Sequence, residues 1–237
     1  MASNYFKVGL IVPSSNTVME PDFHRELGAC CVTSTSRIYL EEVTRDAEQV
    51  MIDEELPKAV RLIKTTEPHV IVFGCTSAGS LGGLESDAAI ARRIEQLSGV
   101  HSLTVVGSVV QQLKAIRPRS VAVFTPYKED LTLSVAQCVV EAGYELRKTA
   151  GMGILANRDI GRVSPDEIVD FVETRIDDAD VDCIFLSCTN WQAIDAIARL
   201  EARFRLPVIS SNHATIEAVR TQLSNFQSAQ TVNARAR

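Results

Sequence analysis

The sequence lacks the segments that would place the protein in or across a membrane. No apolar run approaches the roughly 18 residues that a membrane-spanning helix requires. The polar N-terminus leads directly into a short apolar run, without the charged start, longer apolar stretch and cleavage site of a secretion signal. We therefore expect a cytoplasmic protein that does not bind membranes, in which the 6 cysteines are reduced thiols.

Basic segments and common ligand-binding motifs are also missing. The 24 Lys and Arg residues are outnumbered by 30 Asp and Glu residues, and the net charge of -6 disfavours binding to nucleic acids. No two cysteines form a C-x-x-C pair and the 4 histidines are scattered, so a zinc site is not expected. No G-x-G-x-x-G or P-loop motif follows a predicted strand, and no G-x-S-x-G motif exists. The sequence thus predicts neither a metal nor a cofactor.

The sequence does contain an alternation of short apolar runs with longer helical stretches. Hydrophobic residues make up 46% of the chain and charged residues 23%, which is typical of a folded globular protein. Several runs are apolar on both faces, as strands inside a parallel sheet are. We therefore predict an α/β fold with helices on both faces of the sheet. Strands are expected at residues 8–12, 31–39, 70–73, 102–106, 120–124, 183–186 and 207–209.

Helices are expected between these strands, and a few residues mark their ends. Ser164 followed by Pro165 has the order of an N-cap and a first helical residue, and Gly143 is expected to end the preceding helix. Pro57 should break or offset the first long helix. The polar tail after Ser224 is expected to fray. The predicted helices span residues 49–65, 85–97, 109–116, 129–142, 165–177, 191–204 and 214–223.

An internal repeat divides the chain into two halves. Residues 8–13 resemble residues 121–126, and residues 71–76 resemble residues 184–189, at the same offset of 113 positions. Two matches at one offset indicate a duplicated unit. We predict two pseudo-symmetric, Rossmann-like α/β lobes, each with a parallel sheet flanked by helices, with the active site in the cleft between them. The first lobe is expected to comprise residues 1–108 plus 209–237 and to carry Cys75, and the second, residues 109–208, to carry Cys188.

The repeat singles out two of the cysteines. Cys75 and Cys188 each follow a predicted strand, and a helix N-terminus at such a place lowers the pKa of a thiol toward a reactive thiolate. A single buried cysteine is more often part of the core, but equivalent placement in both halves favours chemistry for this pair. The other cysteines are expected to be packing residues: Cys30, Cys31, Cys138 and Cys183.

Polar residues near the same strand ends are candidate ligands for an anion. Asn16 lies in a loop of neutral donors after the first strand, which is equally consistent with a turn that caps a helix. Tyr127 occupies the matching loop of the second half and could equally be a packing residue. Asn157, taken alone, is better explained as a turn residue. Thr76, Ser77 and Thr189 adjoin the two cysteines, where backbone N–H groups can hold a carboxylate.

These residues together resemble the aspartate/glutamate racemase superfamily, and in particular its maleate cis-trans isomerase branch. The resemblance covers residues 6–224. It implies that Cys75 adds to the double bond of maleate, that a succinyl-cysteine forms, and that Cys188 donates a proton to the neighbouring carbon. It also implies that the two thiols need opposite protonation states, and that the enzyme acts without a cofactor as a homodimer or higher homo-oligomer. The implied binding residues for the small dicarboxylate are Asn16, Thr76, Ser77, Tyr127, Asn157 and Thr189.

Two other functions stay open at this point, and two more are disfavoured. A two-cysteine racemase or epimerase would move an α-proton of an amino acid, or of a derivative as in ectoine breakdown. A non-catalytic sensor could use the same two-lobed frame. Arylmalonate decarboxylases of this superfamily lack the first cysteine, so the presence of Cys75 disfavours their reaction. Amino-acid racemases of this superfamily usually carry an acid near the first strand and a histidine near the second cysteine. This chain has Pro13-Ser14-Ser15-Asn16 and Asn190-Trp191 there, which disfavours a glutamate racemase.

Overall fold

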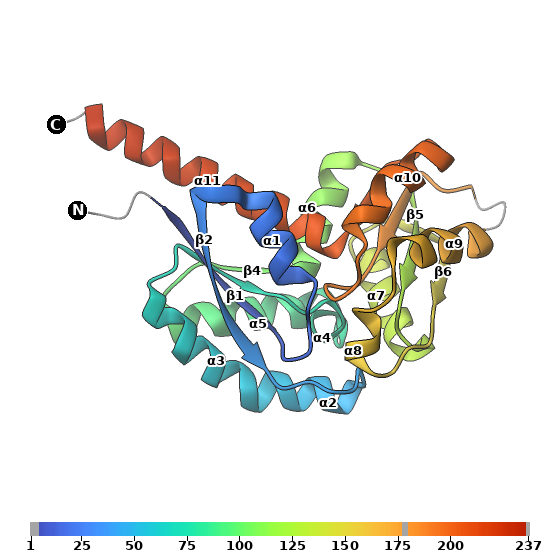
Figure 1. Cartoon of the computed structure of the whole chain (residues 1–237), viewed down its shortest axis with the longest axis horizontal. Coiled ribbons are helices and arrows are strands. Elements are labelled where there is room, and N and C mark those ends of the chain that lie inside the picture. The colour runs from blue at the N-terminus through green and yellow to red at the C-terminus, as the bar shows by residue number, and fades with distance from the viewer. Residues whose placement is uncertain (1–4, 177–179, 236–237) are drawn as a thin grey trace.

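The computed structural model describes residues 5–176 and 180–235 of the chain. Two parallel sheets of four strands each lie side by side, with the strand orders β2-β1-β3-β4 and β6-β5-β7-β8 (Figure 1). The predicted pair of α/β halves is therefore confirmed. The first sheet contains β1 (Phe6–Pro13), β2 (Cys31–Ile38), β3 (Val70–Phe73) and β4 (Ser102–Thr104). The second contains β5 (Ser120–Thr125), β6 (Glu145–Gly151), β7 (Cys183–Leu186) and β8 (Val208–Ser210).

Alternating residues of the first sheet face two different cores. On β3, Ile71 and Phe73 pack with the helices α3 (Leu56–Ile63) and α5 (Gly83–Ser98). Val70 and Val72 face the opposite side, as a two-residue side-chain period requires. That second core continues without a break into the strands of the second half, so the two halves share buried surface. It also takes in α1 (Met19–Leu27), α6 (Val105–Ile116) and α11 (Ser211–Arg235).

The long helical stretch of the first half differs from the prediction in a specific way. The α2 helix (Arg45–Val50) passes through a π-helical segment, Met51–Glu55, into α3. Pro57 lies in the first turn of α3, directly after this segment. Proline has no N–H to donate into the preceding turn, and the wider π pattern accommodates that loss. Pro57 thus offsets the helix and does not end it.

In the second half, α7 (Glu129–Glu141) packs on β5 and β6, and α9 (Pro165–Arg175) packs on α10 (Ile194–Phe204). The predicted cap at Ser164 is confirmed as a capping box with Glu167, and the predicted end at residue 177 lies outside the described residues. Strand β6 was not predicted, because its side chains are mostly polar and it lies at a sheet edge. The helix α11 continues to Arg235, beyond the predicted end at residue 223.

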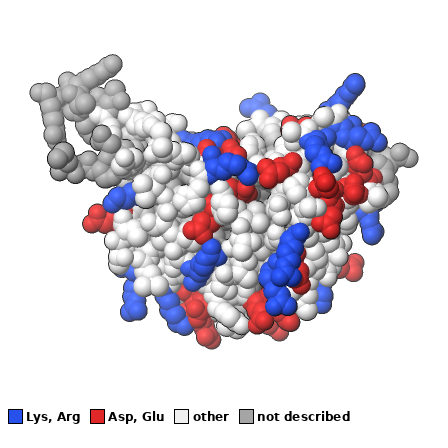
Figure 2. Space-filling model, in the orientation of Figure 1, with Lys and Arg blue, Asp and Glu red and all other residues white. Residues whose placement is uncertain are grey.

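The chain after residue 207 joins the two halves. Strand β8 pairs with β7 in the second sheet, whereas α11, which follows it, packs on α1 and α6. The predicted lobe boundary between residues 208 and 209 falls inside β8 and stays a prediction. On the face shown in Figure 2, Lys and Arg alternate with Asp and Glu. Among the described residues, no helix is long and apolar enough to cross a membrane.

The residue before Cys75 must be small for a structural reason. A Cβ atom on Gly74 would lie 2.7 Å from the sulfur of Met19 and 2.9 Å from the carbonyl oxygen of Ile11, both closer than van der Waals contact. We expect Gly74→Ala to reduce the free energy of unfolding by about 1–3 kcal/mol, because a buried strand and helix must move apart. Urea unfolding measures this effect, and an unchanged midpoint and slope would contradict the close packing.

Candidate active site

Each sheet carries a cysteine at the same relative position. In the first half, β3 is followed by Gly74 and then by Cys75, the N-cap residue of the short helix α4 (Thr76–Ser80). In the second half, β7 is followed by Ser187 and Cys188. Strand β3 lies between β1 and β4, and β7 lies between β5 and β8. Both cysteines therefore stand at the carboxyl edge of a parallel sheet, where ligands bind in open α/β folds.

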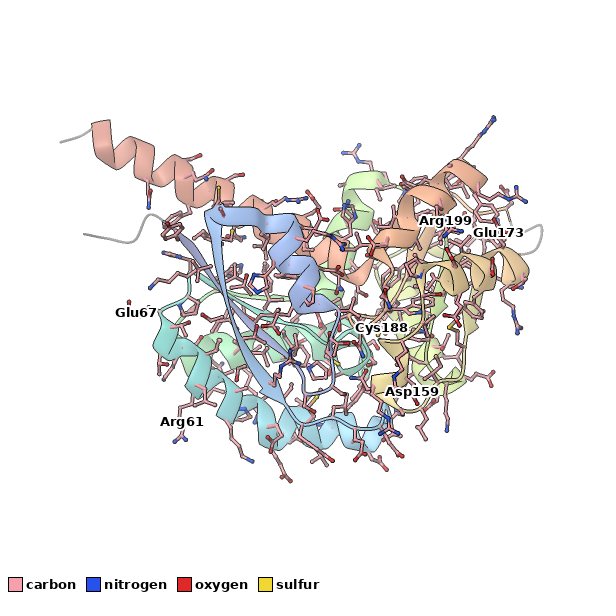
Figure 3. All side chains as sticks on the ribbon, viewed as in Figure 1. Arg61, Glu67, Asp159, Glu173, Cys188 and Arg199 are labelled. Carbon is pink, nitrogen blue, oxygen red and sulfur yellow. The ribbon has the colours of Figure 1, made fainter. Side chains whose placement is uncertain are left out.

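Hydrogen bonds between the two halves bring these cysteines to one site. Thr189, which follows Cys188, donates from Oγ1 to the carbonyl oxygen of Gly74, which precedes Cys75, at 3.0 Å. The pKa of Cys75 is influenced by Cys188, so the two sulfurs lie within electrostatic range. Figure 3 shows Cys188 deep between the halves, whereas Arg61 and Glu173 are at the periphery. Each of the two cysteines is 4% exposed.

Three hydrogen-bond donors surround the sulfur of Cys188. The backbone nitrogen of Asn190 lies 3.3 Å from Sγ, and the backbone N–H of Trp191 and the hydroxyl of Tyr127 also donate to it. Burial has the larger effect and raises the pKa of Cys188 to about 12, while these donors lower it. Burial also raises the pKa of Tyr127 well above its usual value, so its hydroxyl keeps the proton that it donates.

The sulfur of Cys75 has different neighbours. Burial raises the pKa of this thiol most, and the nearby carboxyl of Glu48 raises it further. The backbone N–H of Ala78 and the hydroxyl of Ser77, whose Oγ lies 3.7 Å from Sγ, lower it. The Ser77 hydroxyl has a single proton, which in the structure is donated to Oε1 of Glu48, so Oγ is left to accept from the thiol of Cys75. The two thiols therefore have chemically unequal surroundings.

Glu48 is the site residue that sequence reasoning missed. It lies on α2, is fully buried, and influences the pKa of both cysteines and of Tyr127. Burial raises its own pKa to about 8. The residues around it in the sequence form an ordinary charged helix with no recognisable motif. Only the docking of α2 against α4 places this carboxyl beside the thiols.

The predicted binding residues lie at this site, but several also hold the protein together. Asn16 donates from Nδ2 to Thr189 at 3.0 Å, and its Oδ1 accepts from the backbone of Val18 and Met19. Thr76 donates to Ser211 at 2.9 Å, which ties α4 to the start of α11. The Oδ1 of Asn16 therefore stabilises the turn that leads into α1, whose N-cap residue is Val18 and has no side-chain capping bond. The binding of a ligand by Asn16 and Thr76 stays a prediction.

Asn157 is hydrogen-bonded to residues of both halves of the protein. Its Nδ2 donates to Ser15 at 2.8 Å, its backbone N–H donates to Glu41, and its carbonyl oxygen accepts from Asn190 at 2.7 Å. The neighbouring backbone N–H of Val43 donates to Leu155 in the second half at 2.9 Å. The segment that leads from β2 into α2 is therefore hydrogen-bonded to the second half, and α2, which follows it, carries Glu48.

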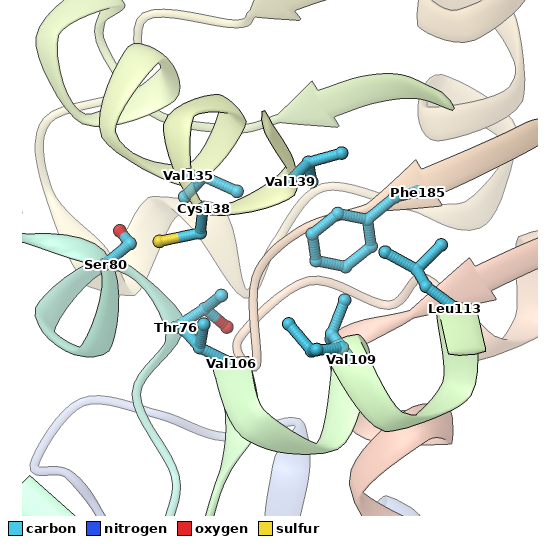
Figure 4. Close-up of a pocket in the computed structure, with 10 residues that line it drawn as sticks. Thr76, Ser80, Val106, Val109, Leu113, Val135, Cys138, Val139 and Phe185 are labelled. Atoms are coloured by element: carbon cyan, nitrogen blue, oxygen red, sulfur yellow. The ribbon is translucent and has the colours of Figure 1, made fainter. Parts of the chain in front are cut away.

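Cys138 and Cys183 are buried packing residues as predicted, whereas the prediction is wrong for Cys30, which is exposed at the end of a short helical turn. Cys31 is partly buried and Cys183 lies within β7. Cys138 lines a mainly apolar pocket between α6 and α7, together with Val106, Val109 and Phe185 (Figure 4). Burial raises its pKa to about 12, which keeps it a thiol. Among the described residues, no three His, Cys, Asp or Glu side chains group closely enough to hold a metal ion.

Comparison with known families agrees with this α/β architecture. The family model described as arylmalonate decarboxylase matches residues 8–234. Since this match spans nearly the whole chain, the protein belongs to that family. The arylmalonate decarboxylase of Bordetella bronchiseptica is 29% identical over 208 residues, which cover 87% of this chain and 86% of that protein.

Within the family, the chain is similar to maleate isomerases. The maleate isomerase of Geobacillus stearothermophilus is 24% identical, over 94% of this chain and 93% of that protein. The crystal structure of the maleate isomerase Iso from Pseudomonas putida S16 aligns with a TM-score of 0.86 at 27% identity, covering 93% of each chain. The Nocardia farcinica maleate cis-trans isomerase shares the fold, with a TM-score of 0.87 at 20% identity and coverage of 93% of each chain. The resemblance expected from the sequence is therefore confirmed.

Proposed function

We propose that the protein converts maleate to fumarate without a cofactor, with Cys75 as nucleophile and Cys188 as proton donor. The observation that carries this proposal is the pair of buried thiols at equivalent sheet edges, joined through the Thr189–Gly74 hydrogen bond. The Pseudomonas putida S16 enzyme has been solved with maleate, and the Nocardia farcinica enzyme with a covalently bound succinylcysteine intermediate. Both precedents support the same chemistry here.

Covalent addition explains how a rigid double bond can turn. The thiolate of Cys75 forms a C–S bond to one alkene carbon, and the π electrons move toward the carboxylate on the other side. The second carbon then takes a proton from the thiol of Cys188. The former double bond is now a single bond with a low rotation barrier. After rotation, Cys188 takes its proton back, the C–S bond breaks and fumarate leaves.

Neutral hydrogen-bond donors are suited to a dicarboxylate that must leave again. Among the described residues, the buried charged side chains are the acids Asp22, Glu48 and Asp87, so no buried cation neutralises the substrate or the thiolate. We assign the carboxylates to Asn16, Tyr127 and Asn157, with the backbone N–H groups near Ser77 and Thr189. Such donors stabilise the negative charge that develops on the substrate during addition.

The decisive assay uses purified protein and maleate with nothing else added. We expect the absorbance of the conjugated diacid to change as maleate is consumed, and fumarate to appear in equal amount by chromatography. A protein that binds maleate without producing fumarate would support the sensor instead.

Tyr127 provides a test of one donor. We expect Tyr127→Phe to lower kcat/KM for maleate by about 10²-fold, because the hydroxyl donates to Cys188 and toward the developing charge. Steady-state kinetics measure this loss. Tyr39→Phe is the matched control, since that side chain is 66% exposed and its hydroxyl bonds to Glu41. Equal rates for the two variants would remove Tyr127 from the site.

One observation favours a second candidate, a two-base amino-acid racemase. The buried carboxyl of Glu48 lies beside the thiols, where it could pair with a substrate ammonium group. In that reaction one thiolate removes an α-proton and the other thiol returns one on the opposite face. A panel of D- and L-amino acids in deuterated solvent separates the two candidates. Deuterium at the α-carbon with no covalent adduct would favour the racemase.

A further inference from the structure

The proposed reaction requires that the thiol of Cys75 lose its proton, and no residue has yet been assigned to accept that proton. Both burial and the neighbouring carboxyl oppose ionisation of this thiol. Loss of the proton to water would place an additional negative charge in a closed site, where charges are poorly solvated. A nucleophilic cysteine in such a place needs an internal proton acceptor.

A chain of hydrogen bonds leads from Cys75 to such an acceptor. The sulfur lies 3.7 Å from Oγ of Ser77, and the Ser77 hydroxyl donates a short hydrogen bond to Oε1 of Glu48. All three side chains are buried, with exposures of 4%, 2% and 0%. The second oxygen of Glu48, Oε2, is buried and has no hydrogen-bond partner among the described residues.

Resting on the proposed function, we infer that Glu48 activates Cys75 by accepting its proton through the hydroxyl of Ser77. As the sulfur attacks the alkene carbon, the S–H bond breaks and its proton passes to Oγ of Ser77. The proton already on Oγ passes to Oε1 of Glu48, and the electron pair of sulfur forms the C–S bond. The reverse transfer returns the proton to Cys75 when fumarate leaves. Glu48 touches neither substrate nor sulfur, so it is a positioning residue.

The relay removes the electrostatic obstacle that Glu48 itself creates. An ionised Glu48 opposes a thiolate on Cys75. Once Glu48 holds the proton it is neutral, so the site carries one negative charge before and after the transfer. Cys188 receives hydrogen bonds from Tyr127 and two backbone N–H groups, and Glu48 acts on it through its charge; among the described residues, no hydrogen bond links Cys188 to a carboxyl. This difference explains why one thiol can attack while the other keeps a proton to donate.

The relay gives the reaction a particular dependence on pH. Glu48 must be ionised to accept a proton, and burial raises its pKa to about 8. We therefore expect kcat/KM to rise with pH and to level off above about 8, since below that value the carboxyl is already protonated. Two charged groups change the pKa of Glu48: Arg45 lowers it and Asp130 raises it. Glu48 in turn raises the pKa of three groups that face it from other elements, Cys75, Tyr127 and Cys188.

The test measures the reactivity of Cys75 without using maleate. Protein is treated with iodoacetamide over a range of about pH 6–9, and alkylation of the Cys75 peptide is timed by mass spectrometry. In the unmodified chain we expect the rate to rise with a midpoint near the pKa of Glu48, about 8. In Glu48→Gln we expect a rate about tenfold or more lower at this pH, because the amide cannot take the proton. Glu54→Gln, an exposed change on the same helical stretch, should not alter the rate.

Ser77→Ala provides a second way to interrupt the relay. It removes the hydroxyl but keeps the backbone N–H, and it should slow alkylation as much as Glu48→Gln does. If circular dichroism shows that Glu48→Gln is unfolded, the alkylation rate of Ser77→Ala tests the relay. Rates within about threefold of the unmodified chain, or no alkylation of the unmodified chain at any pH, would overturn the relay. Because maleate is absent, failure of the proposed isomerisation would appear separately, as a lack of fumarate.

Discussion

Replacing Cys75 by serine is expected to abolish the conversion of maleate to fumarate. The serine hydroxyl has a far higher pKa than a thiol and cannot form the covalent adduct that frees the double bond to rotate. We expect kcat to fall by at least about 10³-fold, as occurs when a covalent nucleophile is removed. Chromatographic detection of fumarate over long incubations measures the residual rate. Because the site keeps its hydrogen-bond donors, maleate should still bind to the variant.

Two further variants show whether this loss is specific. Cys30→Ser changes an exposed thiol, and Cys183→Ala changes a buried thiol at the first residue of β7, the opposite end of that strand from Cys188. Neither should lower kcat/KM by more than about threefold, because neither sulfur can reach the substrate. Isomerisation that survives in Cys75→Ser would refute the covalent mechanism, whatever these controls show.

Replacing Cys188 by alanine is expected to stop turnover and to trap the intermediate. In this variant the thiolate of Cys75 can still add to maleate, and water can slowly supply the proton that Cys188 normally donates. Release requires that proton to be removed again, and the residue positioned to remove it is missing. Intact-protein mass spectrometry should therefore show an increase equal to the mass of maleic acid, and peptide mapping should place it on Cys75.

The same experiment separates the proposed isomerase from the racemase. A racemase predicts no covalent adduct, because its cysteines only transfer protons. An adduct on a different cysteine would also contradict the assignment, and the Cys75→Ser, Cys188→Ala double variant provides the blank. Fumarate production in Cys188→Ala at a rate near that of the unmodified chain would show that Cys188 is not the proton donor.

The halves of the fold could be predicted from sequence because their strands are buried on both faces. Residues 70–73 and 183–186 are wholly apolar, and the structure has strands over the same positions. Strand β6 escaped prediction because an edge strand beside solvent needs no apolar run. The repeat also identified the two cysteines, since duplicated strand ends lie at equivalent sheet edges.

The chemistry around the thiols was less accessible to sequence reasoning. Asn16 and Thr189 were predicted from the sequence to bind the substrate. The structure shows that they also form a hydrogen bond with each other, which links the two halves. Glu48 was missed because a glutamate on a charged helix is normally exposed. Its burial arises where α2 docks against α4, and the segment before α2 is hydrogen-bonded, from Val43 to Leu155, to a part of the chain more than a hundred residues away.

By itself, the sequence determined the α/β class, the two similar halves and the pair of cysteines at equivalent strand ends, since these depend on local patterns of apolar and small residues. Only the tertiary structure decided which groups surround each sulfur, among them the hydrogen bonds that connect Cys75 through Ser77 to the carboxyl of Glu48. The physical reason is that the pKa of a buried group depends on burial and on charges a few ångströms away. Those neighbours come from distant parts of the chain, and packing alone brings them together.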